Sequence, residues 1–192
     1  MALPIIAAVI AGVAVLHETN KKHYQRIEKK RSSHQTREFD KTGVKKLPSD
    51  TYSSNTFVTP MPGSIVCCEV YNMLDHTGIW IDENSIIELS NSGLVKAVST
   101  QRFLDERSGE NMFVACDDQH VPIIIDGCEQ RAINQIFSYR EYDVINNNCH
   151  RFVNSCLSGQ DIELTTFATL NKQLAKLSQK NIYWDKVNVN LL

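Results

Sequence analysis

The sequence predicts an α+β domain in which an antiparallel sheet packs against helices. Short runs rich in isoleucine, valine and aromatic residues fill residues 57–117, which is typical of strands. Apolar residues then recur at helical spacing from residue 127 onward, so helices follow the strands. The chain has 192 residues, of which 42% are hydrophobic and 22% charged; this composition suits one globular domain and excludes a disordered or collagen-like protein.

An apolar segment precedes this domain. Residues 2–16 carry no charged side chain, and a basic stretch follows them directly. As a helix, these fifteen residues would span about 22 Å, which is less than a hydrocarbon core of about 30 Å. The basic residues follow the apolar run, whereas in a secretory signal peptide they precede it. We expect residues 1–16 to form an apolar membrane-anchor helix with the body of the protein in the cytoplasm; a buried helix or a short interfacial segment is the alternative.

Charge is segregated along the chain although the net charge is only −2. Residues 17–50 hold ten basic and five acidic residues, so the rest of the chain holds ten basic and seventeen acidic residues. A basic neck and linker over residues 17–56 suits anionic lipid headgroups beside an anchor, and a plain solubilising spacer is equally consistent with it. We therefore expect a membrane surface as a partner, and the small net charge gives no reason to expect nucleic acid.

Five strands are expected in the first half of the domain. The corresponding runs are 63–71, 76–82, 85–90, 93–99 and 112–117. A tight turn at residues 82–84 would join the second and third runs as an antiparallel hairpin. Such a turn pairs residues whose numbers sum to about 166, which places Glu88 opposite residue 78. Glu88 is then a diagonal neighbour of His76 on the same face of the sheet.

Three helices are expected after the strands. Apolar residues at helical spacing occur within 127–138, 152–157 and 166–178. Gly159 stands where a C-terminal cap would end the second helix. Thr165 or Thr166 can serve as the N-terminal cap of the third helix.

The six cysteines are too sparse for a disulfide scaffold, so we expect reduced and mostly buried thiols. No pair has the C-x-x-C spacing, and the remaining Cys and His positions match the paired spacings of zinc sites poorly. The sequence thus gives no metal site and no cofactor-binding motif.

Cys149 is the thiol that most invites a functional interpretation. It follows three asparagines and opens the second expected helix. A thiol in the first helical turn faces unpaired N–H groups and the positive end of the helix dipole, which favour the nucleophilic thiolate. Catalysis would also need an imidazole and a polar group that orients it; His76 and Glu88 can fill these roles. A cysteine at a helix start is also often inert, and Glu88 could simply face solvent.

Two segments carry a more specific signal in combination. They contain, in order, Pro62-Gly63, His76, Gly78-Ile79-Trp80, Asn148-Cys149 and Phe152-Val153. This pattern, within residues 57–160, resembles the lecithin:retinol acyltransferase-like family, which is related by circular permutation to the NlpC/P60 thiol hydrolases. The resemblance implies a permuted papain-like fold with a catalytic domain at 57–165 and a C-terminal helix and tail at 166–192. It also implies Cys149 as the nucleophile and His76 as the general base.

The sequence departs from the family pattern at two places. Glu88 stands where the retinol acyltransferase-like branch usually has a second histidine, but a carboxylate can equally orient His76 and stabilise its imidazolium. His150 and Arg151 stand where the animal enzymes typically have Glu-His. Since His150 projects about 100° away from Cys149 on a helix, we give it, like Asn148, only a supporting role.

The resemblance implies a cysteine-dependent acyl hydrolase or acyltransferase of the phospholipase/acyltransferase type. Its substrate would be a lipid acyl ester or amide, and the reaction would pass through an acyl-Cys intermediate without a cofactor. One alternative is a cysteine peptidase or amidase of the NlpC/P60 type; cell-wall substrates would then require a body outside the cytoplasm. Another alternative is a non-catalytic, membrane-associated lipid-binding module.

Overall fold

A computed structural model describes residues 43–44, 48, 57–70, 74–82, 84–105, 107 and 111–187. The expected anchor at 1–16 and nearly all of the expected neck at 17–56 lie outside these residues, so both stay predictions. Within the part of the chain that the structure describes, no helix is long and apolar enough to cross a membrane.

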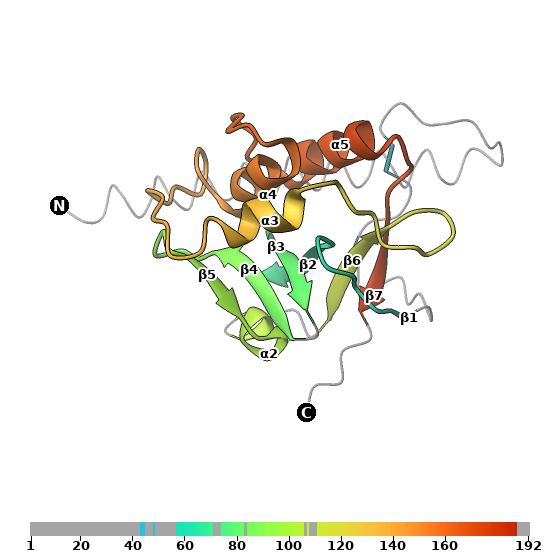
Figure 1. Ribbon diagram of the computed structural model, residues 1–192, viewed down its shortest axis with the longest axis horizontal. Coiled ribbons are helices and arrows are strands. Elements are labelled where there is room, and N and C mark those ends of the chain that lie inside the picture. Colours follow the sequence, from blue (N-terminus) through green and yellow to red (C-terminus); the bar gives the residue numbers. More distant parts are fainter. Residues whose placement is uncertain are drawn as a thin grey trace.

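A seven-stranded sheet forms the centre of the domain, with the strand order β1-β7-β6-β2-β3-β4-β5 (Figure 1). Its strands are β1 (Phe57–Val58), β2 (Ile65–Val70), β3 (Leu74–Asp82), β4 (Ser85–Leu89), β5 (Val95–Val98), β6 (Met112–Cys116) and β7 (Tyr183–Val187). All five expected strands are present, and the α+β class is confirmed. The sheet is mixed rather than antiparallel, because β1 pairs with β7 in parallel.

Strand β7 corrects the expected order of strands first and helices afterwards. It lies after all the helices in the sequence, yet it is inserted between β1 and β6 in the sheet. Its pairing with β6 runs from Phe113↔Lys186 to Cys116↔Tyr183. Sequence analysis assigns no structure to this short segment, because its strand state depends on two partners far away in the chain.

The hairpin of β3 and β4 has the expected register. Ile79 pairs with Ile87 and Trp80 with Ile86, so the paired residue numbers sum to 166 as predicted. The register shifts only next to the turn, between Trp80 and Asp82. The hairpin therefore places Glu88 and His76 on one face of the sheet.

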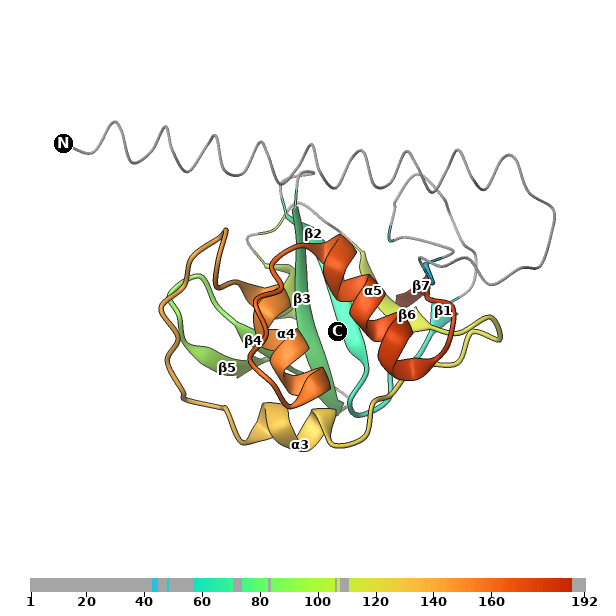
Figure 2. The same ribbon diagram turned by 90° about the horizontal axis from the view of Figure 1, so that it is seen from above.

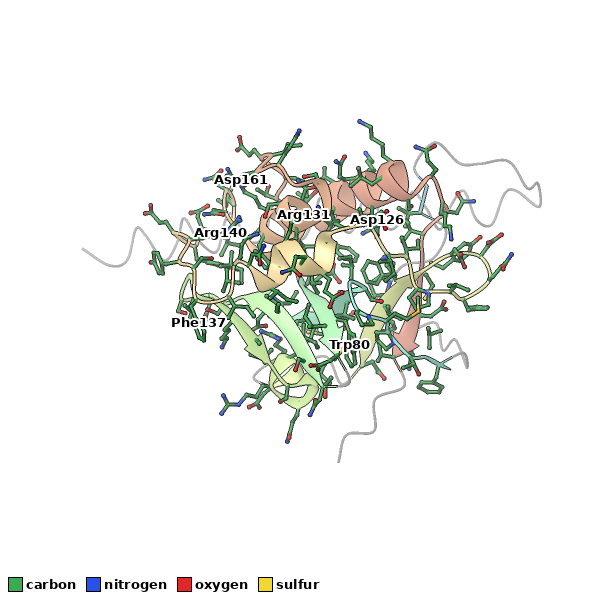
Figure 3. All side chains as sticks on the ribbon, viewed as in Figure 1. Trp80, Asp126, Arg131, Phe137, Arg140 and Asp161 are labelled. Carbon is green, nitrogen blue, oxygen red and sulfur yellow. The ribbon has the colours of Figure 1, made fainter. Side chains whose placement is uncertain are left out.

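Three helices cover the other face of the sheet (Figures 1 and 2). These are α3 (Cys128–Ile133), α4 (Cys149–Ser158) and α5 (Phe167–Ser178). Short helix α2 (Thr100–Leu104), which the sequence does not predict, packs on the face that carries Glu88. Each face has its own apolar cluster: Ile79 and Phe152 belong to the cluster under the three helices, and Trp80 and Phe103 to the cluster beside α2. Figure 3 shows Trp80 on the α2 side and Arg131 on the opposite side.

Helix α4 is fixed at both ends. Asn148 caps its start, and Gly159, at φ 71°, ends it as predicted. From α3, the Arg131 guanidinium donates to the backbone carbonyls of Cys156 and Leu157, two of the acceptors at the helix end that have no partner within the helix. These contacts tie the C-terminal end of α4 to α3, while Asn148 fixes the first turn, where Cys149 lies.

Candidate active site

Cys149 is the first residue of α4, and its side chain is buried. The Asn148 side-chain oxygen accepts hydrogen bonds from the backbone N–H groups of His150 (3.1 Å) and Arg151 (3.3 Å). The Asn148 side-chain nitrogen donates to the carbonyls of Val144 (2.9 Å) and Thr165 (2.8 Å). One amide thus ties together the start of α4, the loop before it and the segment that leads into α5. Asn148 thus fixes the first turn of α4, and its supporting role in catalysis stays a prediction.

His76 lies on a stretch of β3 with only one neighbouring strand. It pairs with Cys68 on β2, whereas the pairing of β3 with β4 begins only at Ile79. The side of β3 that β4 would otherwise cover is therefore open at His76. Helix α4 packs against β3 and β4, and His76 forms a hydrogen bond with Cys149 at the start of this helix. A central strand can in this way present a histidine to the start of a helix.

The structure brings His76 and Glu88 together. The His76 Nε2–H donates to Glu88 Oε2 at 2.8 Å, and both side chains are buried. Because Nε2 is occupied by the carboxylate, Nδ1 is the imidazole nitrogen left for Cys149. The order of the three groups is thus thiol, imidazole and carboxylate, which is the order found in nucleophilic triads.

Gly78 makes room for this arrangement. If the β3–β4 register is extended one residue beyond Ile79↔Ile87, Gly78 is opposite Glu88, and by strand alternation it lies on the same face as His76. A Cβ atom at residue 78 would lie 2.6 Å from a methyl group of Ile86 and 2.9 Å from the Phe103 ring. The absence of a side chain therefore lets α2 bring Phe103 close to the strand, where the ring lies 5.1 Å from the His76 ring.

The surroundings of Cys149 favour the thiolate. Burial by itself raises the pKa of the thiol, but the charges of His150 and His76, and hydrogen bonds with both, bring this pKa well below its ordinary value of 9.0. Burial lowers the pKa of His76, yet the charge of the Cys149 thiolate and its hydrogen bond, together with Glu88, raise it above 6.5 overall. A lowered pKa of the thiol together with a raised pKa of the imidazole is typical of a thiolate–imidazolium pair.

Glu88 stays ionised despite its burial. Desolvation raises the pKa of the carboxyl, but hydrogen bonds and charge from His76 and Arg107 lower it to about 2. The carboxylate is 2% exposed, and Lys96 Nζ lies 3.6 Å from its other oxygen. A buried carboxylate with these partners can stabilise an imidazolium without accepting its proton.

His150 lies closer to the thiol than its projection on the helix suggests. Its Nδ1 is 3.9 Å from the Cys149 sulfur and 3.1 Å from the hydroxyl oxygen of Thr77 on β3. The ring centre lies 5.7 Å from that of Phe167 on α5. His150 thus adds a second imidazole beside the sulfur, while His76 is the one that is bonded to the buried carboxylate.

Four further residues that the sequence does not predict complete the site: Thr77, Phe103, Arg107 and Tyr142. Strand parity could have found Thr77, since it faces the helices when His76 faces α2. Phe103 and Arg107 had no such signal, because Phe103 lies within the unpredicted helix α2 and Arg107 follows it. Tyr142 is partly buried, and burial and the charge of Cys149 raise its pKa, so it stays a neutral phenol.

Fewer free N–H donors remain at the start of α4 than at the N-terminus of an uncapped helix. Asn148 binds the N–H groups of His150 and Arg151, and its own carbonyl accepts from the N–H of Phe152 at 3.1 Å. Among the hydrogen bonds of the described residues, the N–H of Cys149 has no acceptor. This N–H is therefore the helix-start donor left to stabilise an oxyanion on a group attacked by the sulfur.

The other cysteines contrast with Cys149. All six are buried, and none forms a disulfide. Burial raises the pKa of Cys68 to about 12 and that of Cys156 to about 11, and it raises the pKa of Cys67 and Cys128 as well. The site is therefore built around one activated thiol.

Compared with known proteins, the chain matches no family model and no curated protein.

Proposed function

We propose that this protein is a cysteine-dependent acyl hydrolase or acyltransferase that works through an acyl-Cys149 intermediate. One observation carries the proposal: the activated thiol at the start of α4 lies beside His76, whose Nε2 is bonded to buried Glu88 at 2.8 Å. In this proposal Cys149 is the nucleophile, His76 the general base and acid, and Glu88 the residue that orients the imidazole.

In the first half-reaction the Cys149 thiolate attacks the carbonyl carbon of an ester or amide. A C–S bond forms, and the carbonyl electron pair moves to the oxygen, which the Cys149 N–H stabilises. When the tetrahedral intermediate collapses, the bond to the leaving alcohol or amine breaks. The leaving group takes the proton from the His76 imidazolium, and a thioester on Cys149 remains.

In the second half-reaction an acceptor attacks the thioester. The acceptor, which is water, an alcohol or an amine, bonds to the acyl carbon and gives its proton to His76. The bond to sulfur breaks, and Cys149 leaves as the thiolate. Water gives hydrolysis, and another acceptor gives acyl transfer. Glu88 stabilises the imidazolium in both halves and keeps its own charge throughout.

The proposal extends to the fold family and to the class of substrate. The order of the motif residues, the thiol at a helix start and the histidine on the sheet support a permuted papain-like domain of the lecithin:retinol acyltransferase-like type. A lipid acyl group as substrate is supported by the apolar segment 2–16 and the basic residues that follow it, which suit a protein at a membrane surface.

The test is to trap the acyl-enzyme. Purified full-length protein is incubated with phospholipid vesicles or a soluble acyl ester, quenched in acid, and measured by intact mass spectrometry. We expect the wild type to gain the mass of one acyl group on Cys149. Cys149→Ala should gain none, whereas Cys156→Ala, a matched change at a buried thiol of the same helix, should be labelled like the wild type.

Other outcomes decide between classes. Equal labelling of the Cys149 and Cys156 variants would contradict the assigned nucleophile. Labelling by peptide amides but not by acyl esters would favour a peptidase or amidase. Vesicle binding without any acyl adduct, in a folded wild type, would favour a non-catalytic lipid-binding module.

A further inference from the structure

Glu88 has a second strong partner in the site. Arg107 Nη2 donates to Glu88 Oε2 at 2.8 Å, and the same oxygen accepts Nε2–H of His76 at 2.8 Å. Two cationic donors therefore meet on one buried carboxylate oxygen. The mechanism above uses the His76 bond and gives Arg107 no role.

Besides its bond to Glu88, Arg107 makes two contacts with Phe103. Its Nη1 donates to the backbone carbonyl of Phe103, and its guanidinium carbon lies 5.0 Å from the centre of the Phe103 ring. The same ring is 5.1 Å from the ring of His76. Arg107 thus reaches His76 by two routes, through a shared carboxylate oxygen and through a shared aromatic neighbour.

These contacts leave little of Arg107 for a substrate. Its side chain is 15% exposed, and both terminal nitrogens are engaged within the protein. An anionic ligand would have to displace Glu88 from Nη2, which would break the contact that orients His76. The geometry therefore favours a role that Arg107 exerts through Glu88.

We propose that Arg107 is a positioning residue of the candidate active site, which fixes the Glu88 carboxylate against His76 and limits how tightly the imidazole holds its proton. This inference rests on the proposed function of Cys149 and His76. Arginine is always charged in proteins, so Arg107 keeps the buried carboxylate ionised and repels a proton on the imidazole that shares its oxygen. Without Arg107, Glu88 would stabilise the imidazolium more strongly, and His76 would release its proton to a leaving group less readily.

The Cys149 thiolate acts on His76 directly, whereas the other groups near the shared carboxylate are screened or neutral. Lys96 lies 3.6 Å from the second oxygen of Glu88, but its side chain is 42% exposed, so solvent screens its charge. Cys68 is neutral because burial raises its pKa to about 12. The other ionisable groups around the site are Cys149 and His150 on α4, Tyr142 before α4 and Asp75 on β3. None of them donates to the oxygen that Arg107 and His76 share.

The test measures His76 directly. The side-chain nitrogens of His76 are titrated by ¹⁵N NMR in the full-length wild type and in Arg107→Gln. We expect the apparent pKa of the imidazolium to rise by about one pH unit in Arg107→Gln. Arg107→Lys, which keeps the charge but not the two-sided geometry, should give a smaller rise. The alkaline limb of the reaction of Cys149 with dipyridyl disulfide should move in the same direction.

Two controls make the result specific. Lys96→Gln, a change at the other oxygen of the same carboxylate, should shift the His76 pKa by less than a third as much as Arg107→Gln. In a Glu88→Gln background, Arg107→Gln should shift the His76 pKa by clearly less, because the part of the effect that runs through the carboxylate is gone.

The proposal is overturned if Arg107→Gln leaves the His76 pKa unchanged, or if its effect is as large in the Glu88→Gln background. If circular dichroism shows that Arg107→Gln is unfolded, Arg107→Lys decides: it must shift His76 more than Lys96→Gln does. The titration needs no substrate, so its result is independent of whether an acyl-Cys149 adduct forms.

Discussion

At the scale of single residues, Cys149 and Cys156 show how neighbours decide the chemistry of a thiol. Both are buried on α4, two turns apart. Burial raises the pKa of Cys156 to about 11, and the nearby arginines only partly offset it. At Cys149 two imidazoles outweigh the same effect of burial, and the pKa falls well below 9.0. The difference comes from His76 and His150, which lie beside one sulfur and not the other.

This contrast predicts how alkylation by iodoacetamide depends on pH. A lowered pKa means that the Cys149 thiolate persists as the pH falls, so its rate should change by less than about threefold between pH 8 and pH 6. An ordinary thiol loses close to tenfold per pH unit over this range, since only the thiolate reacts. Rates for the individual cysteines can be measured by peptide mass mapping.

In the same assay His76→Gln removes one of the two imidazoles that stabilise the thiolate. Its Cys149 rate at pH 6 should fall by about tenfold or more. Cys156 serves as the internal control, and its slow reaction should be the same in both proteins. A wild-type Cys149 rate that follows the steep pH dependence of an ordinary thiol would contradict the thiolate–imidazolium pair.

At the scale of secondary structure elements, the site depends on how α4 begins and on how the β3–β4 hairpin leaves space beside it. Asn148 satisfies two N–H groups at the helix start and two carbonyls from neighbouring segments. Thr166 caps α5 in a capping box, with its hydroxyl oxygen accepting from Thr169 N–H. The two helix starts are thus capped alike, but only one of them carries the candidate nucleophile.

Replacing Asn148 and Thr166 one at a time separates effects on the free energy of unfolding from effects on the reactivity of Cys149. Asn148→Ala should lower the free energy of unfolding by about 1–2 kcal/mol, because the helix start and two partly buried carbonyls lose their partners. Thr166→Ala should cost about 1 kcal/mol. Only Asn148→Ala should also slow the alkylation of Cys149, by about fivefold or more, as the first turn loosens. Urea unfolding and the alkylation assay test both points, and equal alkylation rates in the two variants would argue against a positioning role for Asn148.

The packing of the β3–β4 hairpin against α2 predicts the effect of a substitution at Gly78. Gly78→Ala should destabilise the fold by about 1–3 kcal/mol, because the new Cβ would overlap a methyl group of Ile86 and the Phe103 ring. In an Ile86→Ala background, which lacks the Cγ2 methyl group that the new Cβ would meet, Gly78→Ala should destabilise the fold by less than in the wild type. Thermal or urea unfolding measures the effect; a Gly78→Ala variant as stable as the wild type would show that α2 can move away from the strand.

At the scale of the whole molecule, the site is assembled from segments distant in the sequence and held by both layers of the domain. The helices on one face supply Cys149 and His150, and α2 on the other face positions Phe103 and Arg107 against Glu88. Strand β7 completes the sheet, and its Trp184 is fully buried, with the indole N–H bonded to Asn171 of α5 at 2.7 Å. The C-terminal segment therefore belongs to the same apolar cluster as Phe152 and Val153 of α4, the helix that begins at Cys149.

Ionised Glu88 couples the site to the stability of the whole fold. Its pKa is lowered from 4.5 to about 2, so its stabilising contribution is present above pH 4.5 and is lost as the pH falls toward 2. The shift corresponds to a contribution on the order of 3 kcal/mol. Between pH 5.5 and pH 3, the wild type should therefore lose more stability than Glu88→Gln in urea unfolding. Parallel losses in the two proteins would show that Glu88 is not the group that titrates.

The sequence by itself determined the local elements and one long-range detail. The alternation of apolar residues predicted five strands, and helical spacing, Gly159 and Thr166 predicted the helices and their ends. The hairpin turn fixed its own register, because an antiparallel pair with a short loop leaves no freedom in which residues face each other. The proximity of His76 and Glu88 followed from that register alone.

Only the tertiary structure decided what completes the site and the sheet. Strand β7, helix α2 and the contacts of Arg107 have no periodic signal, since they are short and are stabilised by partners far away in the chain. The distance between His150 and the Cys149 sulfur likewise depends on how α4 packs against Thr77 and Phe167. Helical geometry alone does not determine it. Local periodicity reports how a segment folds, whereas the chemistry of a thiol depends on charges brought to it through space.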